Sequence, residues 1–155
     1  MNYDDAFERV IGHERGYVDD PDDPGGETKY GISKRSYPGE DIAGLTLDRA
    51  MEIYKRDYWD LCRCDELPDG VDFLVFDAAV NSGVHRSVQW LQEAVGATMD
   101  GVLGPRTLAA VASLSSFLVA ARLCGVRLGF MADLDTWEHF GRGWARRIAK
   151  NLTDL

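Results

Sequence analysis

The sequence lacks two features that would place it in or across a membrane. It contains no apolar run of the length that a membrane span needs, and its first residues, MNYDDAFERV, lack the basic segment and apolar stretch of a secretory signal. We therefore expect no signal peptide and no stable membrane association. The protein is expected to stay in the cytoplasm until something else releases it.

Basic residues are also scarce. Lys and Arg number 17 against 26 Asp and Glu, so the formal net charge is −9. This balance argues against a general nucleic-acid-binding protein, because neutralising phosphates requires a basic surface. A neutral or amphoteric polymer, or a small molecule, is a better partner.

Cysteine and histidine give no sign of a metal or redox centre. The odd number of cysteines, Cys62, Cys64 and Cys124, predicts free thiols. The Cys62-x-Cys64 pair lacks both the two-residue spacer and the second ligand pair of a metal site, and the three histidines have no ligand spacing. We expect neither a metal nor an organic cofactor.

The pattern of apolar residues predicts a mostly α fold of one domain, because a chain of 155 residues is too short for two large independent ones. A stretch dense in Gly, Pro and Asp, from Asp19 to Ser36, follows the first helix and predicts turns or a short hairpin. Helices are expected over 4–13 (stopped by Gly16), after Thr46, and over 71–80, 87–95, 116–130 and 137–152, with another opened by Pro105.

Glu14 is the first candidate for chemistry. Along a helix it would continue the apolar stripe of Phe7, Val10 and Ile11, which would bury its carboxyl in part. Partial burial favours the protonated form, as a general acid near neutral pH requires. The alternative is a Glu at a frayed helix end that turns to solvent.

A second carboxylate could face Glu14 from the Gly-rich segment, as a glycosidase requires. The candidates in this segment are Asp19, Asp20, Asp22 and Asp23. Thr28 could hold a water or a sugar hydroxyl, and Tyr17 and Tyr30 could stack on sugar rings. Each has a structural alternative, because turns favour Asp and tyrosines commonly serve in packing.

The segment His13-Glu14-Arg15-Gly16-Tyr17, with the run PDDPGGETKYGIS that follows, resembles the signature of glycoside hydrolase family 108. These are phage and bacterial N-acetylmuramidases whose signature begins with Glu-Gly-Gly-Tyr. The resemblance implies that Glu14 is the catalytic acid. Arg15 departs from the motif by replacing its first Gly, and we expect its guanidinium to point outward. The layout also resembles the lysozyme-like superfamily, which implies Asp23 and Thr28 as partners across the cleft.

The second half resembles the predicted peptidoglycan-binding region that accompanies this family. The matching elements are FDAAVNSG at 76–83, Leu91-Gln92, Gly96, Asp100-Gly101, Gly104-Pro105-Arg106-Thr107 and Gly143-Trp144-x-x-Arg147. We therefore expect a catalytic part over 1–64 and a helical part over 65–152 that forms the other wall of the cleft. The turns at Asp100-Gly101 and Gly104-Pro105 are interpreted as structural.

Asp77 and Asn81 share a helix face because they are four residues apart. They either bind an N-acetyl group or sugar hydroxyl, or serve the structure, with Asn81 capping the helix and Asp77 pairing with an arginine.

The resemblance implies an endolysin-type muramidase, acting as a monomer on a peptidoglycan glycan strand after a holin releases it from the cytoplasm of the host. A lytic transglycosylase on the same bond, or a non-catalytic peptidoglycan-binding or secretion-accessory protein, is the alternative. A retaining and an inverting outcome both remain open.

Overall fold

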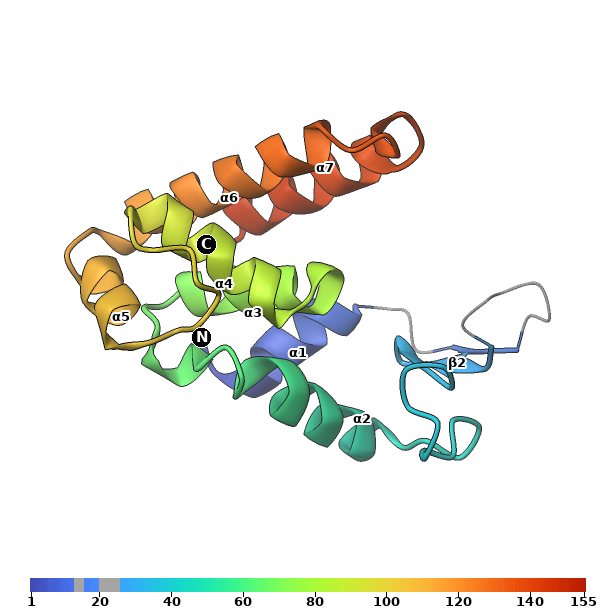
Figure 1. The fold of residues 1–155 in the computed structure, drawn as a ribbon. Coiled ribbons are helices and arrows are strands. Elements are labelled where there is room, and N and C mark those ends of the chain that lie inside the picture. The colour runs from blue at the N-terminus through green and yellow to red at the C-terminus, as the bar shows by residue number, and fades with distance from the viewer. Residues whose placement is uncertain (13–15, 20–25) are drawn as a thin grey trace. The chain divides into compact units, whose positions relative to one another are not determined.

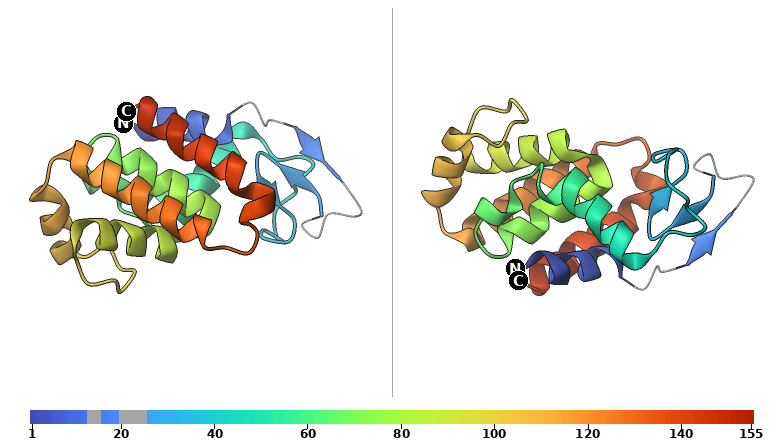
Figure 2. Two further views of the ribbon diagram at one scale, coloured as in Figure 1. Left: turned by 90° about the horizontal axis from the view of Figure 1, so that it is seen from above. Right: turned by 90° about the horizontal axis from the view of Figure 1, so that it is seen from below.

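The structure is a computed structural model that describes residues 1–12, 16–19 and 26–155 (Figure 1). Within these residues the chain is mostly helical, and a small antiparallel sheet follows the first helix. The chain forms two compact units, Asn2–Asp57 and Tyr58–Leu155, and the second unit also includes Met1. The two chain ends, Met1 and Leu155, both belong to this second unit and line the same pocket; Figure 2 gives two further views of the ribbon.

The first helix of the smaller unit, α1 (Tyr3–Ile11), begins at a side-chain cap. Asn2 accepts a hydrogen bond from the Asp5 amide at 2.8 Å, which satisfies one of the free N–H groups of the first turn. The helix ends at Gly12, whose φ of +55° breaks the helical path. The prediction of a helix to His13 that is stopped by Gly16 was therefore wrong, because the earlier glycine ends it.

A three-stranded antiparallel sheet follows α1, in the order β1 (Tyr17–Val18), β2 (Thr28–Lys29) and β3 (Ile32–Ser33); β2 and β3 lie within the predicted excursion, and β1 directly precedes it. The turn between β2 and β3 places Tyr30 at φ +52° and Gly31 at φ +75°, as a two-residue type I′ hairpin requires. A Cβ on Gly31 would lie 2.5 Å from the Tyr54 hydroxyl, which donates to the Tyr30 carbonyl at 3.0 Å. Glycine is thus required at this position.

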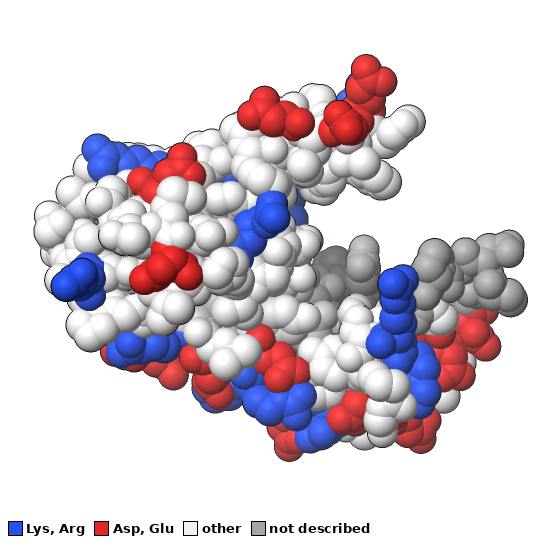
Figure 3. Space-filling model, in the orientation of Figure 1, with Lys and Arg blue, Asp and Glu red and all other residues white. Residues whose placement is uncertain are grey.

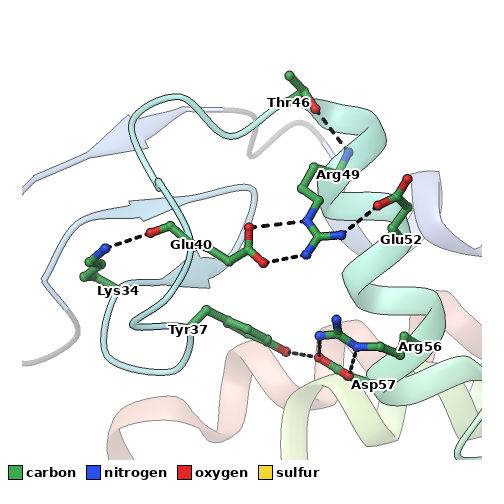
Figure 4. A network of polar contacts seen from close by, with 8 residues as sticks. All are labelled: Lys34, Tyr37, Glu40, Thr46, Arg49, Glu52, Arg56 and Asp57. Atoms are coloured by element: carbon green, nitrogen blue, oxygen red, sulfur yellow. Dashed lines mark hydrogen bonds and ion pairs between the residues drawn. The ribbon is translucent and has the colours of Figure 1, made fainter.

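The second helix of this unit, α2 (Leu47–Tyr54), is capped by Thr46, as expected, and continues into a π-helical turn, Lys55–Trp59. Arg49 on α2 pairs with Glu40 at 2.6 Å and with Glu52 at 2.8 Å (Figure 4). The pair with Glu40 attaches the irregular segment before α2 to the helix, and the pair with Glu52 lies within the helix. Charges of both signs therefore alternate over this region of the surface (Figure 3).

The larger unit is a helical bundle built around α3. Its helices are the 3-10 turn Cys64–Glu66, α3 (Val71–Ser82), α4 (Val84–Val95), α5 (Pro105–Ala112), α6 (Ser116–Ala132) and α7 (Trp137–Thr153). Every residue of α3 from Val71 to Ala79 is buried, with α4 and α6 packed against the helix (Figure 1). Only Gly83 separates α3 from α4, so α4 begins before the predicted Ser87.

The three cysteines, Cys62, Cys64 and Cys124, are free and buried, as their number predicted. Burial raises the pKa of the Cys124 thiol to about 11, which makes it a packing group rather than a nucleophile. No single helix of the described residues is long and apolar enough to cross a membrane.

Candidate active site

Four of the predicted site residues, Glu14, Asp20, Asp22 and Asp23, lie outside the described residues. The helix before Glu14, α1, ends at Ile11. The expectation that Glu14 continues the apolar stripe of this helix lies outside the described residues as well. The assignment of Glu14 therefore depends on the sequence motif and not on helical phase. Of the four aspartates considered, Asp19 is described, and it lies exposed directly after β1.

Thr28 lies in β2, the central strand of the sheet, opposite Val18 on one side and Ser33 on the other. It is half-buried, and its hydroxyl donates to the Gly26 carbonyl at 3.1 Å. A hydroxyl that donates one hydrogen bond keeps its acceptor lone pairs. Thr28 can therefore still accept a hydrogen bond from a water or a sugar hydroxyl.

Tyr17 belongs to the other face of the sheet, because it pairs with Lys29 and side chains alternate along a strand. Its hydroxyl donates to Glu27 at 2.9 Å, and this bond to a carboxylate raises the pKa of Tyr17 to about 12. The residue is 43% exposed, so a neutral aromatic ring is presented to solvent. The sheet does not bring the predicted residues Tyr17 and Thr28 to one face.

Tyr30 lies at the tip of the hairpin and has local contacts of its own. Lys29 places its ammonium 5.6 Å from the centre of the Tyr30 ring and donates to the Ala43 carbonyl at 3.0 Å. Sequence reasoning did not single out Glu27 or Lys29. The alternation of the segment Glu27-Thr28-Lys29 was the available signal, because residues two apart in a strand share a face.

Asp77, on α3 of the larger unit, is 1% exposed and binds two arginines. Its Oδ2 accepts from Arg127 on α6 at 2.5 Å, and its Oδ1 accepts from Arg147 on α7 at 2.7–2.8 Å. The substrate-binding role predicted for Asp77 does not fit this burial, and the alternative of pairing with arginine describes what is present. Arg127 was missed, although a charged residue in the apolar run of α6 was a signal.

Asn81 lies one turn further along α3 and is exposed. Its side-chain amide donates to the Asp77 carbonyl at 2.6 Å, within the last turn of the helix. This hydrogen bond is a capping interaction, which was the structural alternative given for Asn81. The residue itself stays on the surface.

The Gln, Asp-Gly and Thr residues of the second-half motif meet around one buried side chain. Gln92, fully buried on α4, donates to Asp100 at 2.7 Å and to Thr107 at 3.1 Å, and accepts from the Gly101 amide at 2.9 Å. The hydrogen bond from Gln92 lowers the pKa of Asp100 below its ordinary value. These motif residues therefore hold the loop before α5 in place, a structural role.

Within residues 1–12, 16–19 and 26–155, no group of three or more His, Cys, Asp or Glu side chains could hold a metal ion. What the described residues offer at the sheet is a hydroxyl acceptor at Thr28, an exposed neutral phenol at Tyr17 and the Glu27 carboxylate. Thr28 on one face of the sheet, and Tyr17 with Glu27 on the other, each offer groups that can form hydrogen bonds with a polar, uncharged ligand such as a sugar.

Comparison with known proteins gives two family matches and a close structural relative. The profile of the family described as Glycosyl hydrolase 108 matches residues 7–83, and that of the family described as Predicted Peptidoglycan domain matches residues 86–149. No curated protein matches the sequence.

The structure of Brucella abortus SagA is similar to this chain over 98% of its length and 92% of that of SagA, with 37% identity and a TM-score of 0.87. The predicted fold, mostly α and lysozyme-like with a short excursion after the first helix, is confirmed. The resemblance found in the sequence motifs is also confirmed: the chain belongs to the glycosyl hydrolase 108 family and is a peptidoglycan-active glycoside hydrolase.

Proposed function

We propose that the protein is an N-acetylmuramidase that hydrolyses the β-1,4 bond between MurNAc and GlcNAc of peptidoglycan, with Glu14 as the general acid. The observation that carries the proposal is the glycosyl hydrolase 108 match over residues 7–83, which includes the His13–Tyr17 motif. From the same resemblance we propose an endolysin role, with release from the cytoplasm through a holin.

In the proposed mechanism Glu14 donates its proton to the glycosidic oxygen of the leaving sugar. A water then attacks the oxocarbenium-like centre and gives its proton to a carboxylate, for which Asp23 is the first candidate. Thr28 supports this step because its oxygen, already donating to Gly26, retains the lone pairs that accept from a water.

The type I′ turn between β2 and β3 helps to hold the Thr28 hydroxyl oxygen in place. Gly31 and the Tyr54–Tyr30 hydrogen bond fix the hairpin that carries Thr28. A side chain on a short strand that is held at its turn loses little further freedom when it orders a water.

The experiment that tests the proposal is digestion of purified peptidoglycan, followed by identification of the new chain end by mass spectrometry. We expect a reducing-end MurNAc from the wild type. A reducing-end GlcNAc would show cleavage of the other bond, and a 1,6-anhydro-MurNAc end would show a lytic transglycosylase. Either product would overturn the proposal.

The role of Glu14 is tested with Glu14→Gln, which keeps the size of the side chain and removes the proton donor. We expect a loss of about a hundredfold or more in kcat, the range of general acid catalysis. The matched control is Glu8→Gln, an exposed carboxylate of α1. A folded Glu14→Gln protein that still releases muropeptides at the rate of the control would remove Glu14 from the mechanism.

A further inference from the structure

Two adjoining pockets lie between α4 and α6, and their lining includes none of the residues assigned above to catalysis or to the Asp77 and Gln92 networks. One, of about 470 Å³, is lined by Arg86 and Trp90 of α4 and by Phe130 and Asp133 of α6. The other, of about 490 Å³, lies between the end of α4 and the first half of α6 and includes Arg122. Glu93 and Val126 line both pockets, so the two form one groove, which we call the α4–α6 groove.

Two glycines leave the α6 wall of this groove open. Gly125 lines one pocket and Gly129 the other, and a Cβ built on either would meet no atom within 4 Å. These two positions therefore add no side-chain bulk to the α6 wall, and the space beside them stays open.

The groove presents the exposed ring of Phe130, which packs on the buried Trp90, together with charged side chains of both signs. The rings of Trp90 and Phe130 lie 5.3 Å apart, and the Arg86 guanidinium lies 4.5 Å from the centre of the Phe130 ring. Glu93 and Asp133 add negative charge. None of the ion pairs among the described residues involves Arg86, Glu93 or Asp133, so the charges of these three are not compensated by such a pair.

The length of the groove restricts its ligand. From Arg122 to Asp133 the rise of the helix gives a wall of about 16 Å. An extended peptide of four or five residues, at about 3.3 Å per residue, has this length. The exposed charges of both signs complement a peptide that carries both carboxylates and an amine, and the aromatic side chains suit small apolar groups.

We propose that the α4–α6 groove binds the stem peptide of peptidoglycan, with Arg86 and Arg122 facing its carboxylates and Glu93 and Asp133 facing its amine. Stem peptides are short, contain alanine and carry both kinds of charge. All groove residues lie within residues 86–149, which match the Predicted Peptidoglycan domain. The inference rests on the proposed function, because it takes peptidoglycan as the substrate of the enzyme.

The test is an NMR titration of the full-length protein with a sugar-free stem tetrapeptide, L-Ala–D-Glu–diaminopimelate–D-Ala. We expect saturable shifts of the amides of α4 and α6. Gly129→Leu fills the groove and Arg86→Ala removes a carboxylate partner, and each should weaken binding by about tenfold or more. The control is Gly143→Leu, since a Cβ on this exposed α7 glycine would also meet no atom within 4 Å.

Absence of peptide binding by the wild type would overturn the inference, as would equal affinity of Gly129→Leu and the control. Sedimentation tests a different occupant. A wild-type dimer that Gly129→Leu dissociates would assign the groove to a second copy of the chain and would also overturn the inference. Cleavage of peptide-free glycan strands by the wild type is measured in a separate assay. Absence of this cleavage would contradict the muramidase proposal, whereas absence of peptide binding would contradict the proposal for the α4–α6 groove.

Discussion

Asp77 shows how a residue chosen for its chemistry can have a structural role. Helical spacing correctly placed Asp77 and Asn81 on one face, and the hydrogen bond from Asn81 to the Asp77 carbonyl agrees with it. Spacing could not identify Arg127 as the partner of the Asp77 carboxylate, because that arginine is 50 residues away and meets Asp77 only when α6 packs on α3. Contacts between distant residues depend on tertiary packing.

We predict that Asp77→Asn strongly destabilises the protein. Arg127 is 3% exposed, and without the negative charge its guanidinium would be buried uncompensated. Breaking a buried ion pair in this way typically costs about 3–5 kcal/mol of unfolding free energy. Urea unfolding monitored by circular dichroism measures the change.

The control for this prediction is Glu52→Gln, which removes the 2.8 Å pair of Glu52 with Arg49 on the surface of α2. Exposed pairs contribute little, and we expect a change within about 1 kcal/mol. If the two variants lost similar stability, the buried network of Asp77, Arg127 and Arg147 would contribute no more to the free energy of unfolding than an exposed ion pair does.

Thr28 gives a prediction about rate rather than stability. Thr28→Val keeps the shape of the side chain and its preference for a strand but removes the hydroxyl. Under the proposed mechanism kcat should fall about tenfold or more, because the attacking water loses a partner that orients it. KM and the unfolding midpoint should change little. Steady-state kinetics on soluble peptidoglycan fragments separate these effects.

Ser33→Ala, which alters the residue opposite Thr28 on β3, is the matched control. If Thr28→Val were as fast as this control, the Thr28 hydroxyl would have no role in catalysis. Its hydrogen bond to the Gly26 carbonyl would then be its structural role.

At the scale of elements, local signals predicted most helices well. Thr46 and Pro105 stand at helix starts, as expected, and the helix predicted to end at 95 does end there, before Gly96. The prediction failed at the end of α1, where Gly12 and Gly16 were both possible stops. Either glycine can adopt positive φ at no steric cost, so the sequence alone does not decide between them.

The loop between α4 and α5 depends on Gln92, which gives a prediction for this element. Gln92→Met keeps the volume of the side chain but removes its hydrogen bonds to Asp100, Gly101 and Thr107. Thr107 is buried, and leaving its hydroxyl without this partner should cost about 1–3 kcal/mol of unfolding free energy. Gln89→Met is the control, because Gln89 makes one exposed contact, at 3.4 Å, with the Met99 carbonyl.

The same variant should change the dependence of stability on pH. The pKa of Asp100 is lowered in the folded protein, mainly by Gln92, so its contribution is present above the ordinary carboxyl value of about 4 and is lost as the pH falls through the lowered pKa. Urea midpoints at pH 7 and pH 3 should therefore differ less for Gln92→Met than for the wild type. An unchanged difference would show that Asp100 is stabilised by other groups.

At the scale of the whole molecule, the boundary between the two family matches does not coincide with the boundary between the compact units. The first match ends at residue 83, after α3, whereas the structural division follows Asp57. By structure α3 belongs with the helices of the second match. The Asp77 network joins residues from both matches, and the Ser87 hydroxyl of α4 donates to the Val75 carbonyl of α3 at 2.7 Å.

This mismatch predicts which fragment can fold. A fragment of residues 84–155 carries all of the second match but lacks α3, whose buried run from Val71 to Ala79 occupies the centre of the bundle. It would expose the apolar faces of α4 and α6 and leave the charge of Arg127 unpaired, so we expect no cooperative unfolding transition. A fragment of residues 58–155 retains α3 and should unfold cooperatively in urea, with dispersed amide signals in NMR spectra. A folded 84–155 fragment would contradict the role given to α3, because the second match would then be an independent domain and α3 an attachment to it.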